Sequence, residues 1–208
     1  MTRIWLFSLA ALATLGLGVL ILPSFSPEAQ GCHADKQASD LSQTEANAIY
    51  DCIKDNLAAS YASANGVPDV SRYRTWTNVT TAPLVSATHG RRLVNHLVND
   101  IALELYTQWE GMKGQRFPTD AAVAKESFRI TQSGEVRPGP LFIMQKAAPG
   151  ASPATDDWIY TRVFPDGTFQ RTLGTASDKV LFCHDCHVKV LKDYDAMFFP
   201  TVPFRAKN

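Results

Sequence analysis

Residues 157–173 have the sequence DWIYTRVFPDGTFQRTL, in which two strand-like runs, 157–164 and 168–173, flank the tripeptide Pro-Asp-Gly. Proline fixes the first torsion angle of a turn and glycine accepts a positive one, so the tripeptide is typical of a β-hairpin. The strands on either side of a hairpin turn run antiparallel. This stretch therefore predicts an antiparallel sheet in the C-terminal half of the chain.

Further strands are expected before this hairpin. Segments 122–131 and 141–147 are strand-like, and the residues between them are rich in Gly and Pro,. The region 73–98 has a short apolar pattern that Pro83 and a His-Gly pair at 89–90 interrupt, which predicts one or two strands joined by a loop,. A sheet of several antiparallel strands follows from these segments.

Helices are predicted around this sheet. Ser42 and Glu45 have the spacing of a capping box, and apolar residues then recur at every third or fourth position as far as Ala64,. A second helix is predicted from Asp100, and a third over about 177–192. The predicted fold class is α+β, an antiparallel β-sheet with flanking helices, one of them close to the C-terminus.

The N-terminal residues differ from the rest of the chain. Arg3 precedes an apolar run over 4–22, whose length lies between a signal-peptide core and a membrane span,. Residues 1–22 are predicted to be a signal peptide or an N-terminal membrane anchor, and both outcomes export the remainder. Residues 23–41 are rich in polar residues and proline, which predicts a linker. Residues 42–208 then form one domain in the periplasm or outside the cell.

The charge of the chain excludes one class of partner. Twenty Lys and Arg residues balance twenty Asp and Glu residues, and the basic residues are scattered along the sequence. Proteins that bind nucleic acid concentrate positive charge on one face. No nucleic-acid partner is therefore expected.

The motif that carries chemistry is Cys-His-Asp-Cys-His at 183–187. Two cysteines three positions apart, with a histidine directly after the second, form the attachment pattern of c-type haem. On a helix Cys183, Cys186 and His187 share one face, so the sulfurs can reach two vinyl groups while the imidazole meets the iron. This predicts one covalent haem c with His187 as an iron ligand. His184 is expected to point to solvent.

Two other interpretations of the motif compete with haem. A structural zinc site needs four ligands, and Cys32-His33 would have to supply the second pair from the predicted linker. A redox-active dithiol would open a helix in a βαβ unit, whereas this motif lies inside a helix in an antiparallel context. Cys32 and Cys52 are then left over, which predicts a disulfide in an oxidising compartment, with two unpaired thiols as the alternative.

The sequence resembles the cytochrome P-460 family over roughly 43–205. The matching segments are Tyr73-Arg74-Thr75-Trp76, Val123-Ala124-Lys125-Glu126-Ser127-Phe128, Pro138-Gly139-Pro140-Leu141-Phe142, Asp157-Trp158, and the haem motif followed by Phe198-Phe199. The resemblance implies a mainly antiparallel β fold with flanking helices, usually a homodimer. It also implies a five-coordinate haem whose distal side is open.

The resemblance assigns a role to Lys125. In hydroxylamine-oxidising members of the family a lysine in the matching strand bonds covalently to the haem edge. Strand alternation places Lys125 on one face with Val123 and Ser127, so the side chain can point into a pocket. A solvated strand lysine that discourages edge pairing is the alternative.

The distal side of the haem has several candidates. Catalytic members of the family place a positive side chain near the open iron position, and the corresponding stretch here supplies Arg92, Asn95 and His96, with His89 just before it. Such a donor would stabilise negative charge on a bound ligand. The methionines are expected to be core residues, or one of them a sixth iron ligand: Met112, Met144 and Met197.

The expected function is that of an exported mono-haem c-type cytochrome. It binds a small nitrogen ligand, hydroxylamine or NO, and either oxidises hydroxylamine or detoxifies NO, passing electrons to a redox partner protein. The catalytic candidates are Lys125, His96 and Arg92. Two alternatives are a non-catalytic gas-binding or sensing haem module and a six-coordinate electron-transfer cytochrome.

Overall fold

The computed structural model of the chain describes residues 31–172 and 178–207. The predicted signal peptide or anchor, residues 1–22, lies outside these ranges, as does the first part of the predicted linker. Within the described ranges no helix is long and apolar enough to cross a membrane.

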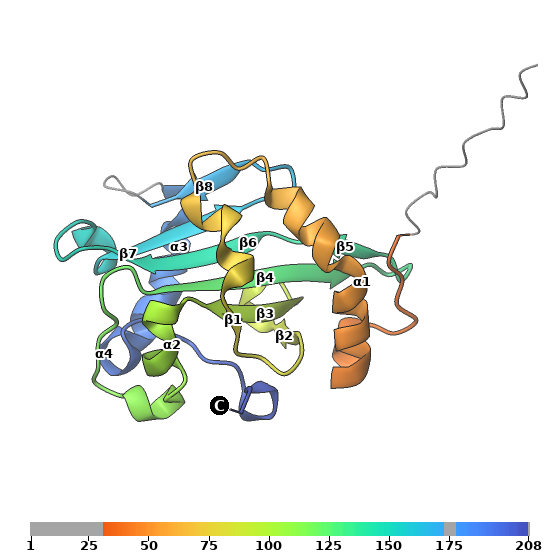
Figure 1. Cartoon of the computed structure of the whole chain (residues 1–208), viewed down its shortest axis with the longest axis horizontal. Helices are drawn as coiled ribbons and strands as arrows, with labels where there is room; N and C mark the ends of the chain where they lie inside the picture. The colour runs from red at the N-terminus through yellow and green to blue at the C-terminus, as the bar shows by residue number, and fades with distance from the viewer. Residues whose placement is uncertain (1–30, 173–177, 208) are drawn as a thin grey trace, which may run out of the picture. The chain divides into compact units, whose positions relative to one another are not determined.

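A single antiparallel sheet organises the described part of the chain (Figure 1). Its strands are β1 (Thr77–Asn78), β2 (Leu84–Ser86), β3 (Arg92–Val98), β4 (Ala122–Ile130), β5 (Val136–Pro138), β6 (Leu141–Lys146), β7 (Trp158–Val163) and β8 (Phe169–Arg171). The strand order is β1-β3-β4-β6-β7-β8, with β2 also paired to β3 and β5 to β4. Every one of these pairs is antiparallel, so the predicted α+β class is confirmed.

The strand predictions hold for the long strands and miss short ones. β4, β6 and β7 occupy the predicted segments, and β7 and β8 form the expected hairpin, with Gly167 at φ +79° in its turn. The region 73–98 contains three strands rather than one or two, because β1 and β2 are separate segments that follow each other along the same edge of β3, and the chain turns back once, between β2 and β3. β5 was not predicted, because three residues are too few to show an alternating pattern.

The helices begin where the capping residues place them. They are α1 (Gln43–Tyr61), α2 (Asp100–Tyr106), α3 (Asp178–His187) and α4 (Leu191–Tyr194). Ser42 and Glu45 form the predicted capping box of α1. Asn99, not Asp100, caps α2, because its side chain accepts from the Ala102 N–H. The predicted C-terminal helix is divided, since a 3-10 turn at Val188–Val190 separates α3 from α4.

Short 3-10 helices connect these elements. They are η1 (Ala38–Asp40), η2 (Pro68–Ser71), η3 (Tyr73–Thr75), η4 (Ala87–His89), η5 (Trp109–Met112), η6 (Pro153–Thr155), η7 (Val188–Val190) and η8 (Val202–Phe204). Of these, η4 matters most for the site, because it leads directly into β3.

The two faces of the sheet are covered by different elements. Figure 1 shows α1 in front of the sheet and α3 behind it. Ala124 and Phe128 of β4 pack with Leu57 of α1 in one hydrophobic cluster, whereas Val123 belongs to a second cluster that Cys183 of α3 contacts. Because successive strand residues point to opposite faces, β4 supplies alternate side chains to the two clusters.

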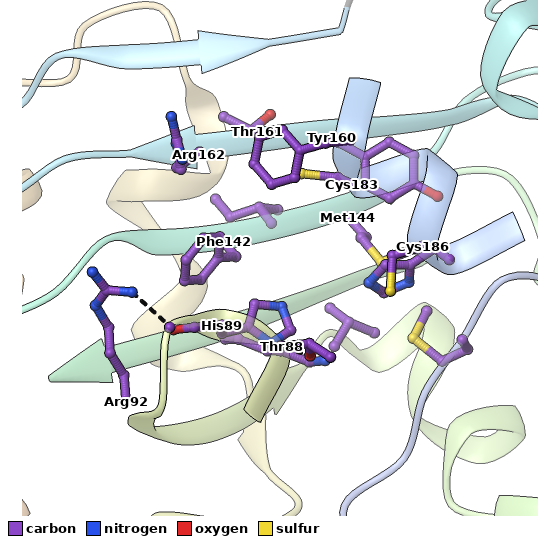
Figure 2. Close-up of a pocket in the computed structure, with 17 residues that line it drawn as sticks. Thr88, His89, Arg92, Phe142, Met144, Tyr160, Thr161, Arg162, Cys183 and Cys186 are labelled. Carbon is purple, nitrogen blue, oxygen red and sulfur yellow. Dashed lines mark hydrogen bonds between the residues drawn. The ribbon is translucent and has the colours of Figure 1, made fainter. Parts of the chain in front are cut away.

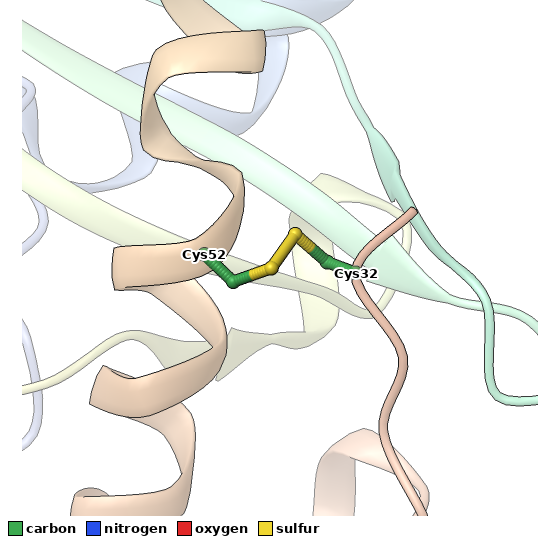
Figure 3. Close-up of a disulfide and its surroundings, with 2 residues drawn as sticks. All are labelled: Cys32 and Cys52. Atoms are coloured by element: carbon green, nitrogen blue, oxygen red, sulfur yellow. A yellow bond between two sulfur atoms is a disulfide. The ribbon is translucent and has the colours of Figure 1, made fainter. Parts of the chain in front are cut away.

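Residues 31–41 belong to the folded unit, so the predicted linker is too long. The folded unit begins at Gly31, and Ala34, which is buried, donates its N–H to the Gly134 carbonyl. Cys32 is joined to Cys52 of α1 by a disulfide, as predicted (Figure 3). The sequence did not predict that this segment is folded, because its contacts are made by the backbone and by one disulfide, and neither gives an apolar pattern.

Candidate functional site

A cavity lies on the α3 face of the sheet (Figure 2). Its volume is about 230 Å³, and one side is open to solvent. Side chains of β4, β6 and β7 form the floor, while η4 with the start of β3 and the helix α3 supply residues to the walls. The sheet order places η4 on the β3 side and α3 on the β7 side, so the cavity lies between these two elements.

The three motif residues named in the sequence all line this cavity. Cys183 and Cys186 are half-buried free thiols on α3, and His187 is buried one position further along the same helix. The spacing along a helix explains the convergence, because positions three and four apart share a face. Burial raises the pKa of the Cys183 thiol to about 11, so the thiol is protonated at neutral pH.

His187 presents one defined nitrogen to the cavity. Its Nδ1 lies 2.7 Å from the Ala196 carbonyl oxygen, and because a carbonyl only accepts, Nδ1 carries the proton,. Nε2 is then the unprotonated nitrogen, with its lone pair available to a metal. Burial lowers the pKa of His187 to about 4, which keeps the ring neutral at pH 7. The rings of Tyr160 and Phe198 pack edge-on against it.

His184 does not point to solvent, so that prediction is wrong. Its side chain is 13% exposed and packs edge-on against Tyr160, with Nε2 3.5 Å from a carboxylate oxygen of Asp156. The reason is its position three residues before His187, which places both rings on the side of α3 that faces β7.

Lys125 is buried in the cavity floor and is not a solvated lysine. Its side chain lies opposite Phe142 in register, and the residue is 7% exposed. Within the described ranges its ammonium has neither a hydrogen bond nor an ion pair. Burial lowers the pKa of Lys125 to about 8, because the cavity wall solvates a charge poorly,.

The distal candidates separate into two groups. Asn95 and His96 do not line the cavity: Asn95 accepts a hydrogen bond from Thr80, and His96 Nδ1 lies 2.8 Å from the Tyr106 hydroxyl. His89 and Arg92 do line it. His96 was favoured as a catalytic residue, and its engagement with Tyr106 argues against that role.

His89 is held in place by its loop. Its Nδ1 lies 2.7 Å from the Ser86 hydroxyl, and its ring packs edge-on against Phe142 at 4.8 Å between centroids. Gly90, at φ +72°, reverses the chain there, and a Cβ at Gly90 would overlap the Arg92 side chain. Burial lowers the pKa of His89 to about 2, so this ring is also neutral.

The three methionines considered as iron ligands do not all lie at the cavity. Met144 and Met197 line the cavity, whereas Met112 is fully buried in the second hydrophobic cluster and away from it. Met112 is therefore a core residue, as expected. The candidates for a sixth ligand are reduced to two.

Several lining residues did not emerge from the sequence. They are Thr88, Phe142, Tyr160, Arg162 and Phe182. Phe142 and Met144 alternate on β6, and Tyr160 and Arg162 alternate on β7, in register with each other. The alternation of side chains along β6 and β7 could have predicted that these residues share one face of the sheet. It does not indicate which face carries the site.

The two rival interpretations of the motif lose support. Cys32, required for the zinc site, is in the disulfide with Cys52. Among the described residues no group of three or more His, Cys, Asp or Glu side chains could hold a metal ion. The motif also lies beside an antiparallel sheet, not in the βαβ unit that a thioredoxin-type dithiol requires,.

Neither the protein-family models nor the curated proteins include a match to this chain. The resemblance to the cytochrome P-460 family therefore stays a prediction.

Proposed function

We propose that this protein is an exported c-type cytochrome that carries one haem on Cys183 and Cys186, with His187 as the proximal ligand. The observation that carries the proposal is the convergence of two free thiols and one oriented imidazole on a single cavity wall. A haem bound there would supply an iron centre that takes small ligands and exchanges electrons.

The residues around the cavity fit such a group. The floor offers apolar and aromatic side chains, including Val123, Phe142 and Met144, to a flat apolar ring. The cavity is smaller than the roughly 300–1,000 Å³ of typical small-molecule sites. A haem held there by Cys183, Cys186 and His187 would therefore be only partly enclosed by the cavity.

The ligand we propose is a small nitrogen species, hydroxylamine or NO. The wall opposite α3 contains His89, a neutral ring whose Nδ1 is held by Ser86. This ring can exchange a hydrogen bond with a ligand bound between η4 and α3. His89 thus takes the distal role for which His96 and Arg92 were considered.

Lys125 supports a catalytic version of this function. Its depressed pKa gives a sizeable fraction of neutral amine near pH 8, and only a neutral amine is a nucleophile,. Attachment of this amine to the haem edge would replace one N–H and one ring C–H bond by a C–N bond, with the two hydrogens and two electrons passing to an external oxidant such as a peroxide, and would match the hydroxylamine-oxidising members of the P-460 family. Electrons from the substrate would pass to a redox partner protein, and the family resemblance favours a homodimer.

The experiment is expression in a host that matures c-type haem, followed by intact mass measurement. The expected mass is that of the chain plus one haem, with pigment that resists extraction by acidified organic solvent. Cys183→Ser with Cys186→Ser should release the pigment, while the matched control Cys32→Ser with Cys52→Ser should retain it. A colourless unsubstituted protein would refute the proposal.

Optical spectra of the ferrous protein separate the versions of this function. A red-shifted Soret band with Lys125 linked to haem peptides supports the hydroxylamine-oxidising version. A high-spin spectrum without the link supports a gas-binding or sensing module. Sharp low-spin bands that vanish in Met144→Leu or Met197→Leu support an electron carrier.

A further inference from the structure

The cavity wall is positively charged. Lys125, Arg92 and Arg162 line it, and among the described lining residues there is no carboxylate. Burial and the nearby positive charges of Arg129 and Arg162 lower the pKa of Arg92. A site with this composition favours an anionic ligand, because an anion offsets charges that otherwise repel each other.

Each of the two arginines is anchored at one end and has a free donor at the other. Arg92 donates from Nη1 to the His89 carbonyl at 2.8 Å, and Arg162 donates from Nη2 to Gln170 Oε1 at 2.6 Å. The Nε atoms of both are covered by protein and do not reach the cavity. The free donors are Arg92 Nη2 and Arg162 Nη1, which make no hydrogen bond in the described part of the chain and are not among its buried unpaired atoms, so each can donate to an acceptor in the cavity,.

The arginines lie at the opposite end of the cavity from the cysteines. Figure 2 shows Arg92 and Arg162 on one side of the site, and Cys183 and Cys186 on the other. The register agrees, because the motif histidine packs on Tyr160 and Arg162 is two residues further along β7. Arg92, at the first residue of β3, marks the same end.

The two edges of a haem differ in the same way as the two ends of this cavity. Its two vinyl groups lie on one edge, and its two propionate carboxylates lie on the opposite edge. Two thioethers at Cys183 and Cys186 would fix the vinyl edge on α3 and direct the carboxylates away from it. We propose that Arg92 and Arg162 bind the two haem propionates, one each. This inference rests on the proposed function, and it assigns Arg92 to cofactor binding instead of catalysis.

The test compares the midpoint potential of the haem-loaded protein with that of the double variant Arg92→Gln/Arg162→Gln. Loss of two positive charges beside the propionates should lower the potential, because positive charge disfavours the oxidised iron. A pH-dependent potential should also appear between about pH 5 and 8, because unpaired propionates then take up protons in that range. Arg92→Lys/Arg162→Lys keeps both charges and should restore most of the potential.

The matched control is Arg129→Gln. Arg129 is one of the positive charges near Arg92, but it is exposed and does not line the cavity. The inference is overturned if the double variant matches this control in potential and in pH dependence. Should the double variant yield no holoprotein, each single Gln variant is measured, and one that matches Arg129→Gln refutes the assignment of that arginine.

A small oxyanion has the same charge as a propionate and is the competing occupant. Nitrite is therefore titrated at constant ionic strength into the unsubstituted holoprotein and the double variant. A spectral change that the double variant loses would place a free anion at the arginines and overturn the inference. Equal responses support propionate binding. Failure of the unsubstituted protein to bind haem would refute the proposed function, a result distinct from both.

Discussion

Lys125 and Glu126 are neighbours in β4, yet their side chains are buried on opposite faces of the sheet. Lys125 lines the cavity, and Glu126 is fully buried on the α1 face. There the carboxylate accepts hydrogen bonds from Tyr50 and Tyr73, both at 2.6 Å, and from Arg74 at 2.9 Å. The sheet separates the two charges, so Glu126 is satisfied by its own donors, and Lys125 has no counter-ion among the residues that the structure describes.

The burial of Lys125 predicts that haem-free protein gains stability with rising pH. The folded state holds the pKa near 8, against 10.5 for the unfolded chain. Between these values the unfolded chain binds the proton and the folded chain does not. Stability is therefore lost as pH falls from about 10.5 to about 8, and the cost is fully present below that. Lys125→Met should then stabilise by up to about 3 kcal/mol at pH 6.5, since one pKa unit is about 1.4 kcal/mol.

Urea denaturation at pH 6.5 and pH 9.5 measures this difference. The gain from Lys125→Met should be larger at pH 6.5 and should shrink at pH 9.5. Lys189→Met, at an exposed position of η7, controls for the removal of one positive charge. An equal, pH-independent effect of both substitutions would contradict the assignment of a depressed pKa to Lys125.

The donors around Glu126 should be important for stability. Arg74→Met leaves a buried carboxylate without its counter-ion and should destabilise by about 3–5 kcal/mol. Tyr73→Phe removes one hydrogen bond to a charged acceptor and should cost about 1.5–3 kcal/mol. Both are measured as free energies of unfolding in urea. Lys54→Met breaks a largely exposed pair with Asp51 and should cost no more than about 1 kcal/mol,.

How much of this architecture could be predicted depended on the range of the interactions. The capping box at Ser42 and the hairpin at 165–167 are set by adjacent residues, and both are found as expected. The convergence of Cys183 and His187 is likewise a property of one helix turn. Neighbouring residues do not determine which of His89 and His96 lines the cavity. His89 does so because η4 packs against β6, where its ring contacts Phe142, a residue far along the chain.

The proposed distal position of His89 predicts an effect on ligand release in the haem-loaded protein. His89→Leu removes a neutral hydrogen-bonding group and should speed dissociation of a bound nitrogen ligand by about 2- to 10-fold, the equivalent of roughly 0.5–1.5 kcal/mol. Stopped-flow displacement of NO from the ferrous protein measures the rate. His33→Leu, at an exposed position outside the cavity, should leave the rate unchanged. Equal rates in the two variants would remove His89 from the distal side.

The disulfide predicts a stability difference that is independent of the haem site. Cys32 and Cys52 are 20 residues apart, and closing a loop of this length should contribute about 3 kcal/mol by restricting the unfolded chain,. Cys32→Ala/Cys52→Ala should lose that amount in urea denaturation. Adding a thiol reductant should lower the unsubstituted protein to the level of the variant and leave the variant unchanged. The proposed thioethers at Cys183 and Cys186 would resist such reductants, so in haem-loaded protein any loss of stability on reduction should come from the Cys32–Cys52 bond.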